Sequence, residues 1–91
     1  MSNGANGTDL PSLLELFRAT ASEVVEKDMS HVVSTSLIGE LGIDSLAVLE
    51  IIGSMERALH IHIPDEALTG VESVADLLGV VRGRIQQRAQ S

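Results

Sequence analysis

The sequence predicts an all-α fold, a four-helix bundle of three main helices and one short helix. Three stretches of the chain carry apolar residues at the spacing that places them on one face of a helix. A long stretch between the first two of them has no such period and is rich in Ser and Gly, which predicts a long loop. No pair of stretches has the pattern of paired strands.

The 91 residues are enough for one small domain. By composition, residues 1–8 form a flexible N-terminal tail, residues 9–88 the folded domain and residues 89–91 a C-terminal tail. A domain of this size buries only about 60–65% of its unfolded surface, which leaves little room for an enclosed active site. We therefore expect a protein that is not an enzyme.

The first helix begins near Leu10, and either Asp9 or Thr8 can cap it. Ser12 and Glu15 also fit a capping box, which leaves the start open by one turn. Its apolar positions are 10, 13, 14, 17, 21, 24 and 25.

Residues 27–44 form the long loop, with a short helical turn expected near Leu37. We expect Leu37, Leu41 and Ile43 to anchor this loop on the core. Loops of this length are uncommon in compact domains unless they are functional.

The second helix is predicted for residues 45–59, with Asp44 as its N-cap. Leu46, Leu49 and Gly53 lie on the arc opposite its apolar stripe, where polar residues are expected. Exposed leucines are ordinary, but two of them beside acidic residues also fit an apolar anchor for a partner protein. The stripe that faces the core consists of Val48, Ile51, Ile52, Met55 and Leu59.

After this helix, the alternation of residues 60–64 predicts an extended connector with Ile61 and Ile63 facing inward. Residues 64–68 then form a single helical turn that Gly70 closes. The last helix begins near Ser73, which forms a capping box with Asp76. Its core stripe consists of Val74, Leu77, Leu78, Val81 and Ile85.

Composition excludes several classes of function. The 13 acidic residues against 6 basic ones make nucleic acid a poor partner, and the single aromatic residue, Phe17, offers no platform for stacking bases. The absence of cysteine excludes a disulfide scaffold, a thiolate metal site and a cysteine nucleophile. We find no signal peptide and no membrane span, so the expected location is the cytoplasm, away from membranes.

Acidic residues are concentrated in the middle of the chain. Residues 40–66 contain six acidic residues against Arg57 alone. Such a segment either keeps a solvated face soluble or attracts a basic partner surface.

Ser45 opens the second helix, where unpaired backbone N–H groups and the helix dipole stabilise a bound anion. By position alone, Asp44 or Ser45 is more often an ordinary capping residue. A hydrolytic triad of Asp44, Ser45 and one of His31, His60 or His62 lacks the strand-supported turn that exposes a nucleophilic serine. His60 and His62 lack further ligands for zinc, so we expect no metal site.

The run Leu41-Gly42-Ile43-Asp44-Ser45-Leu46, with Glu50 after it, closely resembles acyl carrier proteins. The later run Ile61-His62-Ile63-Pro64-Asp65-Glu66 extends the resemblance, which covers about residues 10–85. The resemblance implies the family's four-helix bundle and a covalent 4′-phosphopantetheine on Ser45. It further implies that a phosphopantetheinyl transferase attaches this arm and that its thiol carries acyl groups as thioesters.

By the same resemblance, Asp44 and Leu46 serve recognition by the transferase. Acyltransferase and ketosynthase-type enzymes are the other implied partners, and the docking helix offers them Leu46, Leu49, Glu50, Gly53 and Glu56. A groove between the helices could shelter the acyl chain; its expected lining is Ile52, Met55, Ile63 and Leu68.

Some residues depart from carriers of fatty-acid synthesis. Ala47 stands where those carriers commonly have an acid, and Arg57, Ala58 and His60 make the helix less acidic. We therefore expect a carrier for polyketide or other specialised biosynthesis. We also expect it to be discrete and monomeric. A carrier for fatty-acid synthesis and a non-catalytic helical adaptor remain the alternatives, and labelling of Ser45 by a transferase separates carrier from adaptor.

Overall fold

A computed structural model describes residues 9–90, with side chains to residue 88. This part of the chain is all-helical, as predicted, and its only strand-like pairing is an isolated bridge between Leu37 and Ser73. The elements are α1 (Leu10–Val25), the 3-10 turn η1 (Ile38–Glu40), α2 (Ser45–Leu59), the 3-10 turn η2 (Asp65–Leu68) and α3 (Val74–Gln90).

The two predicted tails have different outcomes. The N-terminal tail, residues 1–8, lies outside the described residues. In the C-terminal tail predicted for residues 89–91, α3 continues through Gln90, and residue 91 lies outside the described residues. Residues 84–90 contain no glycine or proline, and Arg, Gln and Ala favour helix.

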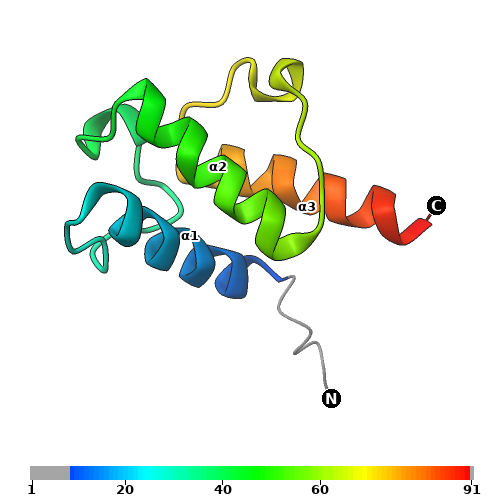
Figure 1. The fold of residues 1–91 in the computed structure, drawn as a ribbon, viewed down its shortest axis with the longest axis horizontal. Coiled ribbons are helices and arrows are strands. Elements are labelled where there is room, and N and C mark those ends of the chain that lie inside the picture. Colours follow the sequence, from blue (N-terminus) through cyan, green and yellow to red (C-terminus); the bar gives the residue numbers. More distant parts are fainter. Residues whose placement is uncertain (1–8, 91) are drawn as a thin grey trace.

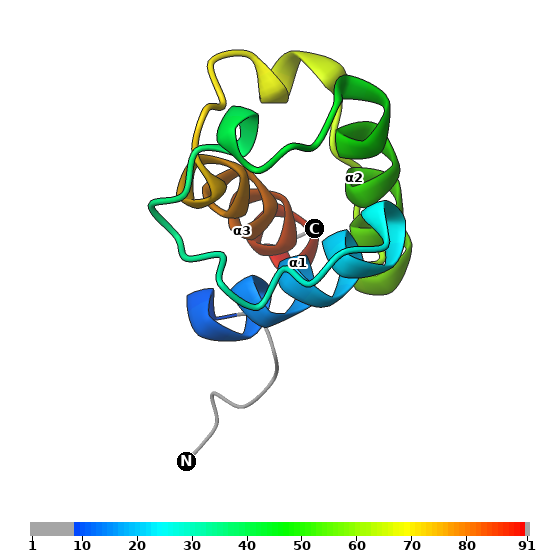
Figure 2. The ribbon, with the colours of Figure 1, turned by 90° about the vertical axis from the view of Figure 1, so that its left-hand side faces the viewer.

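The three α-helices surround one core (Figures 1 and 2). Helix α1 packs against both α2 and α3, and η2 packs against α3. The loop after α1 crosses one end of the bundle before it enters α2 (Figure 2). The buried apolar side chains are Leu13, Phe17, Ala21, Met29, Val32, Ile43, Ile51, Ile52, Met55, Ile63, Val74, Leu77, Leu78, Val81 and Ile85.

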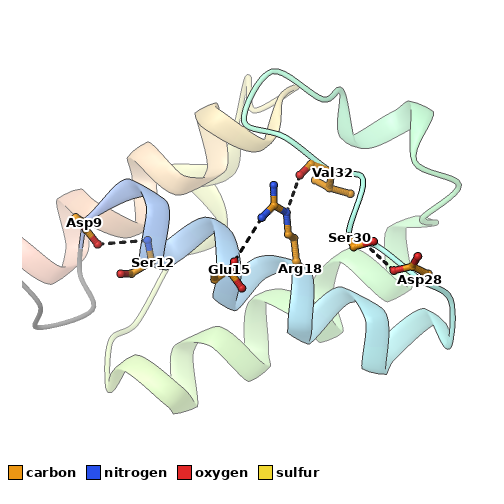
Figure 3. Close-up of polar contacts among 7 residues, drawn as sticks. All are labelled: Asp9, Ser12, Glu15, Arg18, Asp28, Ser30 and Val32. Atoms are coloured by element: carbon orange, nitrogen blue, oxygen red, sulfur yellow. Dashed lines mark hydrogen bonds and ion pairs between the residues drawn. The ribbon is translucent and has the colours of Figure 1, made fainter.

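Side-chain caps mark the helix starts that the sequence predicts. Asp9 Oδ1 accepts a hydrogen bond from the Ser12 N–H at 3.3 Å, so Asp9 is the cap of α1 (Figure 3). Ser73 and Asp76 form the expected reciprocal box, with bonds of 3.0 and 3.1 Å. The hydrogen bond from the Ser73 N–H, followed by that from Glu72, lowers the pKa of Asp76.

The long loop is anchored partly by residues that the sequence analysis did not single out. Met29 and Val32 are buried, and the Arg18 Nε of α1 donates a hydrogen bond to the Val32 carbonyl at 2.7 Å (Figure 3). Ile43 is buried as expected, whereas the side chain of Leu37 is 43% exposed, so its role as a core anchor is wrong. Leu37 instead pairs through its backbone in the bridge to Ser73.

Backbone hydrogen bonds fasten this loop to the start of α3. They connect residues 34–38 with residues 72–75 shortly before the chain reaches α2. The bonds run from Ile38 N to Glu72 O (2.9 Å), from Val74 N to Ser36 O (2.9 Å) and from Ala75 N to Ser34 O (2.8 Å). The approach to α2 is therefore held by α3 as well as by the core.

The connector after α2 is held by a carboxylate. Glu56 Oε2 accepts a hydrogen bond from the Ile63 N–H at 2.6 Å and lies 3.5 Å from His62 Nδ1. Ile63 is buried and Ile61 packs against the core, as predicted. Arg84 of α3 donates to the His62 carbonyl at 2.9 Å, so both α2 and α3 hold the connector.

Removal of this carboxylate is expected to weaken the fold. Glu56→Ala leaves the Ile63 N–H without its acceptor, which should lower the free energy of unfolding by about 1–3 kcal/mol. Glu56→Gln retains an acceptor oxygen and should lose less. Urea unfolding measures both variants, and Glu50→Ala on the exposed face of α2 is the control. Equal urea midpoints for Glu56→Ala and the control would contradict the proposed role of Glu56.

Candidate functional site

The start of α2 is fixed by Asp44. Asp44 has extended backbone angles (φ −80°, ψ 173°), and its Oδ1 accepts a hydrogen bond from the Ala47 N–H at 2.8 Å. The Asp44 carbonyl accepts the Val48 N–H at 3.0 Å, which is the first bond of the helix. The cap and the helix limits, Ser45–Leu59, are those that the sequence predicts.

The residues before Asp44 direct the chain into this helix. Gly42 has φ +75°, a left-handed conformation that glycine adopts without the steric cost of a side chain. Ile43 follows and is buried in the core. The left-handed turn at Gly42 and the buried side chain of Ile43 therefore place Asp44 and Ser45 at the surface.

Ser45 occupies the first position of α2 with an exposed side chain. Among the described residues, no hydrogen bond holds its hydroxyl. The N–H groups of Ser45 and Leu46 lie in the first turn, where helix N–H groups have no intrahelical partner. These groups and the helix dipole favour an anion at this end of α2. A phosphodiester on Ser45 fits this position.

The structure separates Ser45 from the two histidines of the connector. His60 and His62 follow the C-terminal end of α2, and a helix of 15 residues is about 21 Å long. The structure therefore does not assemble a triad of Ser45 with either of them. In residues 9–88, no three His, Cys, Asp or Glu side chains form a group that could hold a metal ion.

Beside Ser45, α2 exposes most of the residues predicted to contact partners. The side chains of Leu46 and Leu49 are 67% and 56% exposed, and Glu50 is exposed as well. Gly53 lies one turn beyond Leu49 on the same side and is half-buried. These four residues form one surface that leads away from Ser45.

Glu56 does not join this surface. Its side chain is only 25% exposed, and the Ile63 N–H and His62 occupy its carboxylate. The expectation that Glu56 points outward is therefore wrong. At about 100° per residue it lies roughly 85° from the centre of the core stripe, so a Glu side chain can reach the connector.

A groove of about 460 Å³ lies between α2, η1, the segment after η2 and α3. Of the predicted lining residues, Ile52 and Leu68 are present, whereas Met55 and Ile63 are buried elsewhere in the core. The sequence analysis missed the contribution of the loop, because that segment has no period to indicate which residues face inward. The lining consists of Leu37, Ile38, Gly39, Glu40, Val48, Leu49, Ile52, Leu68, Val71, Glu72 and Leu77.

The chain is similar to several known proteins. The family described as "Phosphopantetheine attachment site" matches residues 15–81, most of the chain. The tetracenomycin polyketide synthase acyl carrier protein of Streptomyces glaucescens is 37% identical over 65% of this chain and 71% of its own length. The anthracycline acyl carrier protein DpsG of Streptomyces peucetius is 32% identical over 88% of this chain and 94% of its own length.

Similarity extends to much larger proteins. A 3-methylorcinaldehyde synthase of Phoma sp is 27% identical over 85% of this chain, but the chain spans only 3% of that synthase.

None of the helices in residues 9–90 combines the length and apolar character needed to cross a membrane. The family match and the two carriers of similar length show that this chain belongs to the acyl carrier proteins, the family whose covalent cofactor is 4′-phosphopantetheine.

Proposed function

We propose that Ser45 carries the phosphopantetheine arm and that the chain presents acyl thioesters to the enzymes of polyketide biosynthesis. The observation that carries this proposal is the exposed, unbonded hydroxyl of Ser45 at the open N-terminal end of α2. The arm, once attached, supplies the thiol that forms the thioester. The protein itself supplies an anchored serine, an anion-stabilising helix end and a surface for partner enzymes.

The assignment to polyketide biosynthesis is supported by the relatives of similar length. Both named carriers of Streptomyces come from polyketide or anthracycline systems, and both alignments cover more than two thirds of the relative. The composition of α2 also supports this assignment, since Arg57 and Ala47 differ from the residues that carriers of fatty-acid synthesis commonly have there.

The partner surface of this proposal consists of Leu46, Leu49, Glu50 and Gly53. Exposed apolar side chains next to a charged rim are typical of a protein interface. The phosphopantetheinyl transferase would contact Asp44 and Leu46 beside the serine. Acyltransferase and ketosynthase-type enzymes would use Leu49, Glu50 and Gly53 further along the helix.

The attachment site is tested by mass measurement. After incubation with coenzyme A and a promiscuous phosphopantetheinyl transferase, the wild-type chain should gain one arm and Ser45→Ala none. Circular dichroism should change little, because Asp44 still caps α2. Ser34→Ala, at an exposed serine of the loop before α2, is the control and should be fully modified. Modification of Ser45→Ala to the wild-type extent would falsify the assignment.

The partner surface is tested by two substitutions. Leu49→Ala should change the free energy of unfolding by less than about 1 kcal/mol, because its side chain is 56% exposed, yet it should weaken acyl transfer. Glu50→Lys should slow association with partners, and the loss should shrink as salt screens the charge. Thermal melts and transfer kinetics at low and high salt measure both effects.

Glu66→Lys in η2 makes the same change of charge away from α2 and serves as the control. Should Leu49→Ala lower stability by several kcal/mol while each folded molecule transfers normally, Leu49 belongs to the core and partners dock elsewhere.

A further inference from the structure

A shallow hollow of about 450 Å³ lies along the outward face of α2, next to the last turns of α1. Val24 of α1 contributes to it, together with Leu49 and Gly53 of α2. Glu50 lies at the end nearer to Ser45, and Ser54 and Arg57 lie at the far end. At about 100° per residue, Leu46, Gly53 and Arg57 follow one line along the helix surface. The hollow therefore continues the proposed partner surface beyond Gly53.

The guanidinium of Arg57 is held in place at the far end of this hollow. Its Nη2 donates a hydrogen bond to Ser54 Oγ at 3.2 Å. A Cβ added at Gly53 would lie 3.7 Å from Arg57 Nη1, so the guanidinium lies over the backbone of Gly53. At this distance an added Cβ would make an ordinary van der Waals contact, so the cation lies along the helix beside residue 53.

Glu56 cannot balance this cation on the outward face, because its carboxylate is bound to the Ile63 N–H. On the outward face of α2, the exposed charged groups beside the hollow are therefore the carboxylate of Glu50 and the guanidinium of Arg57. They are seven positions apart, which is about 10 Å along a helix. Along α2 the acidic group lies nearer to Ser45 and the basic group further away, with Gly53 and Ser54 between them, while Leu49 and Val24 supply the apolar lining of the hollow.

We propose that this pair of opposite charges determines which partner enzymes the carrier binds. The partner fitted to this surface presents an apolar side chain to the hollow, a cationic side chain to Glu50 and a carboxylate to Arg57. A partner with a uniformly basic docking surface is disfavoured, because it places a like charge against Arg57. This inference rests on the proposed function, since it assumes that partners dock on α2.

The test measures the dissociation constant between the unmodified chain and the ketosynthase to which the carrier delivers its acyl group. Arg57→Glu should weaken binding about tenfold at low salt, Arg57→Gln about threefold and Arg57→Lys little. High salt should reduce the differences. In acyl transfer by the modified carrier, the same changes should raise KM and leave kcat nearly unchanged.

A matched control separates the local charge from the net charge. Gln86→Glu makes the same change of net charge as Arg57→Gln, but at an exposed position of α3 outside the hollow, so binding should stay at the wild-type value. Thermal melts of all variants should agree closely with that of wild type, because Arg57 is exposed.

The outcomes distinguish the two proposals. If Glu50→Lys weakens binding while Arg57→Glu leaves it unchanged or tightens it, the requirement for an acidic group on the partner is overturned and docking on α2 stands. If Leu49→Ala, Glu50→Lys and Arg57→Glu all bind as wild type does, docking on α2 itself is overturned, and this inference with it.

Discussion

The hydrogen bond from the Ala47 N–H to the Asp44 carboxylate determines where α2 begins, and the site depends on that point. It makes Ser45 the first residue of the helix, exposed and next to the unpaired N–H groups of the first turn. If the helix began one residue later, each of its residues would be one position nearer to the helix start. Each side chain would then point in a direction about 100° different relative to that start. The bonds between residues 34–38 and residues 72–75 hold the loop segment that precedes this cap.

Helix α2 has a different task on each side. Its inner side buries Ile51, Ile52 and Met55 in the core, and Glu56 on its flank fastens the connector. Its outer side presents Leu46 and Leu49 to solvent. Burial of exposed leucines against a partner is favourable, and under our proposal the neighbouring charges would restrict which partner can cover them. An anchored serine beside such a surface suits a protein that brings its cargo to other enzymes.

Local patterns predicted the helices well, because caps and apolar periods act over a few neighbouring residues. Asp44, Ser73 and Asp76 cap as their types and spacing indicate. The loop was predicted less well, since nothing in its sequence distinguishes buried Met29 and Val32 from exposed Leu37. The role of Glu56 and the lining of the groove depend on segments that meet only in the folded chain. Ser45 is proposed as the attachment site because a helix start, an anion-binding end and a family resemblance converge on it.

The account is tested most directly by comparing amide spectra of the ¹⁵N-labelled chain before and after phosphopantetheine is attached. A phosphodiester held at the start of α2 should shift the amides of residues 44–48 most, with downfield proton shifts for Ser45 and Leu46 as their N–H groups gain an anionic acceptor. Residues of α1 and the distant part of α3 should change little. Largest shifts around another serine, or modification without a change at the start of α2, would contradict the account.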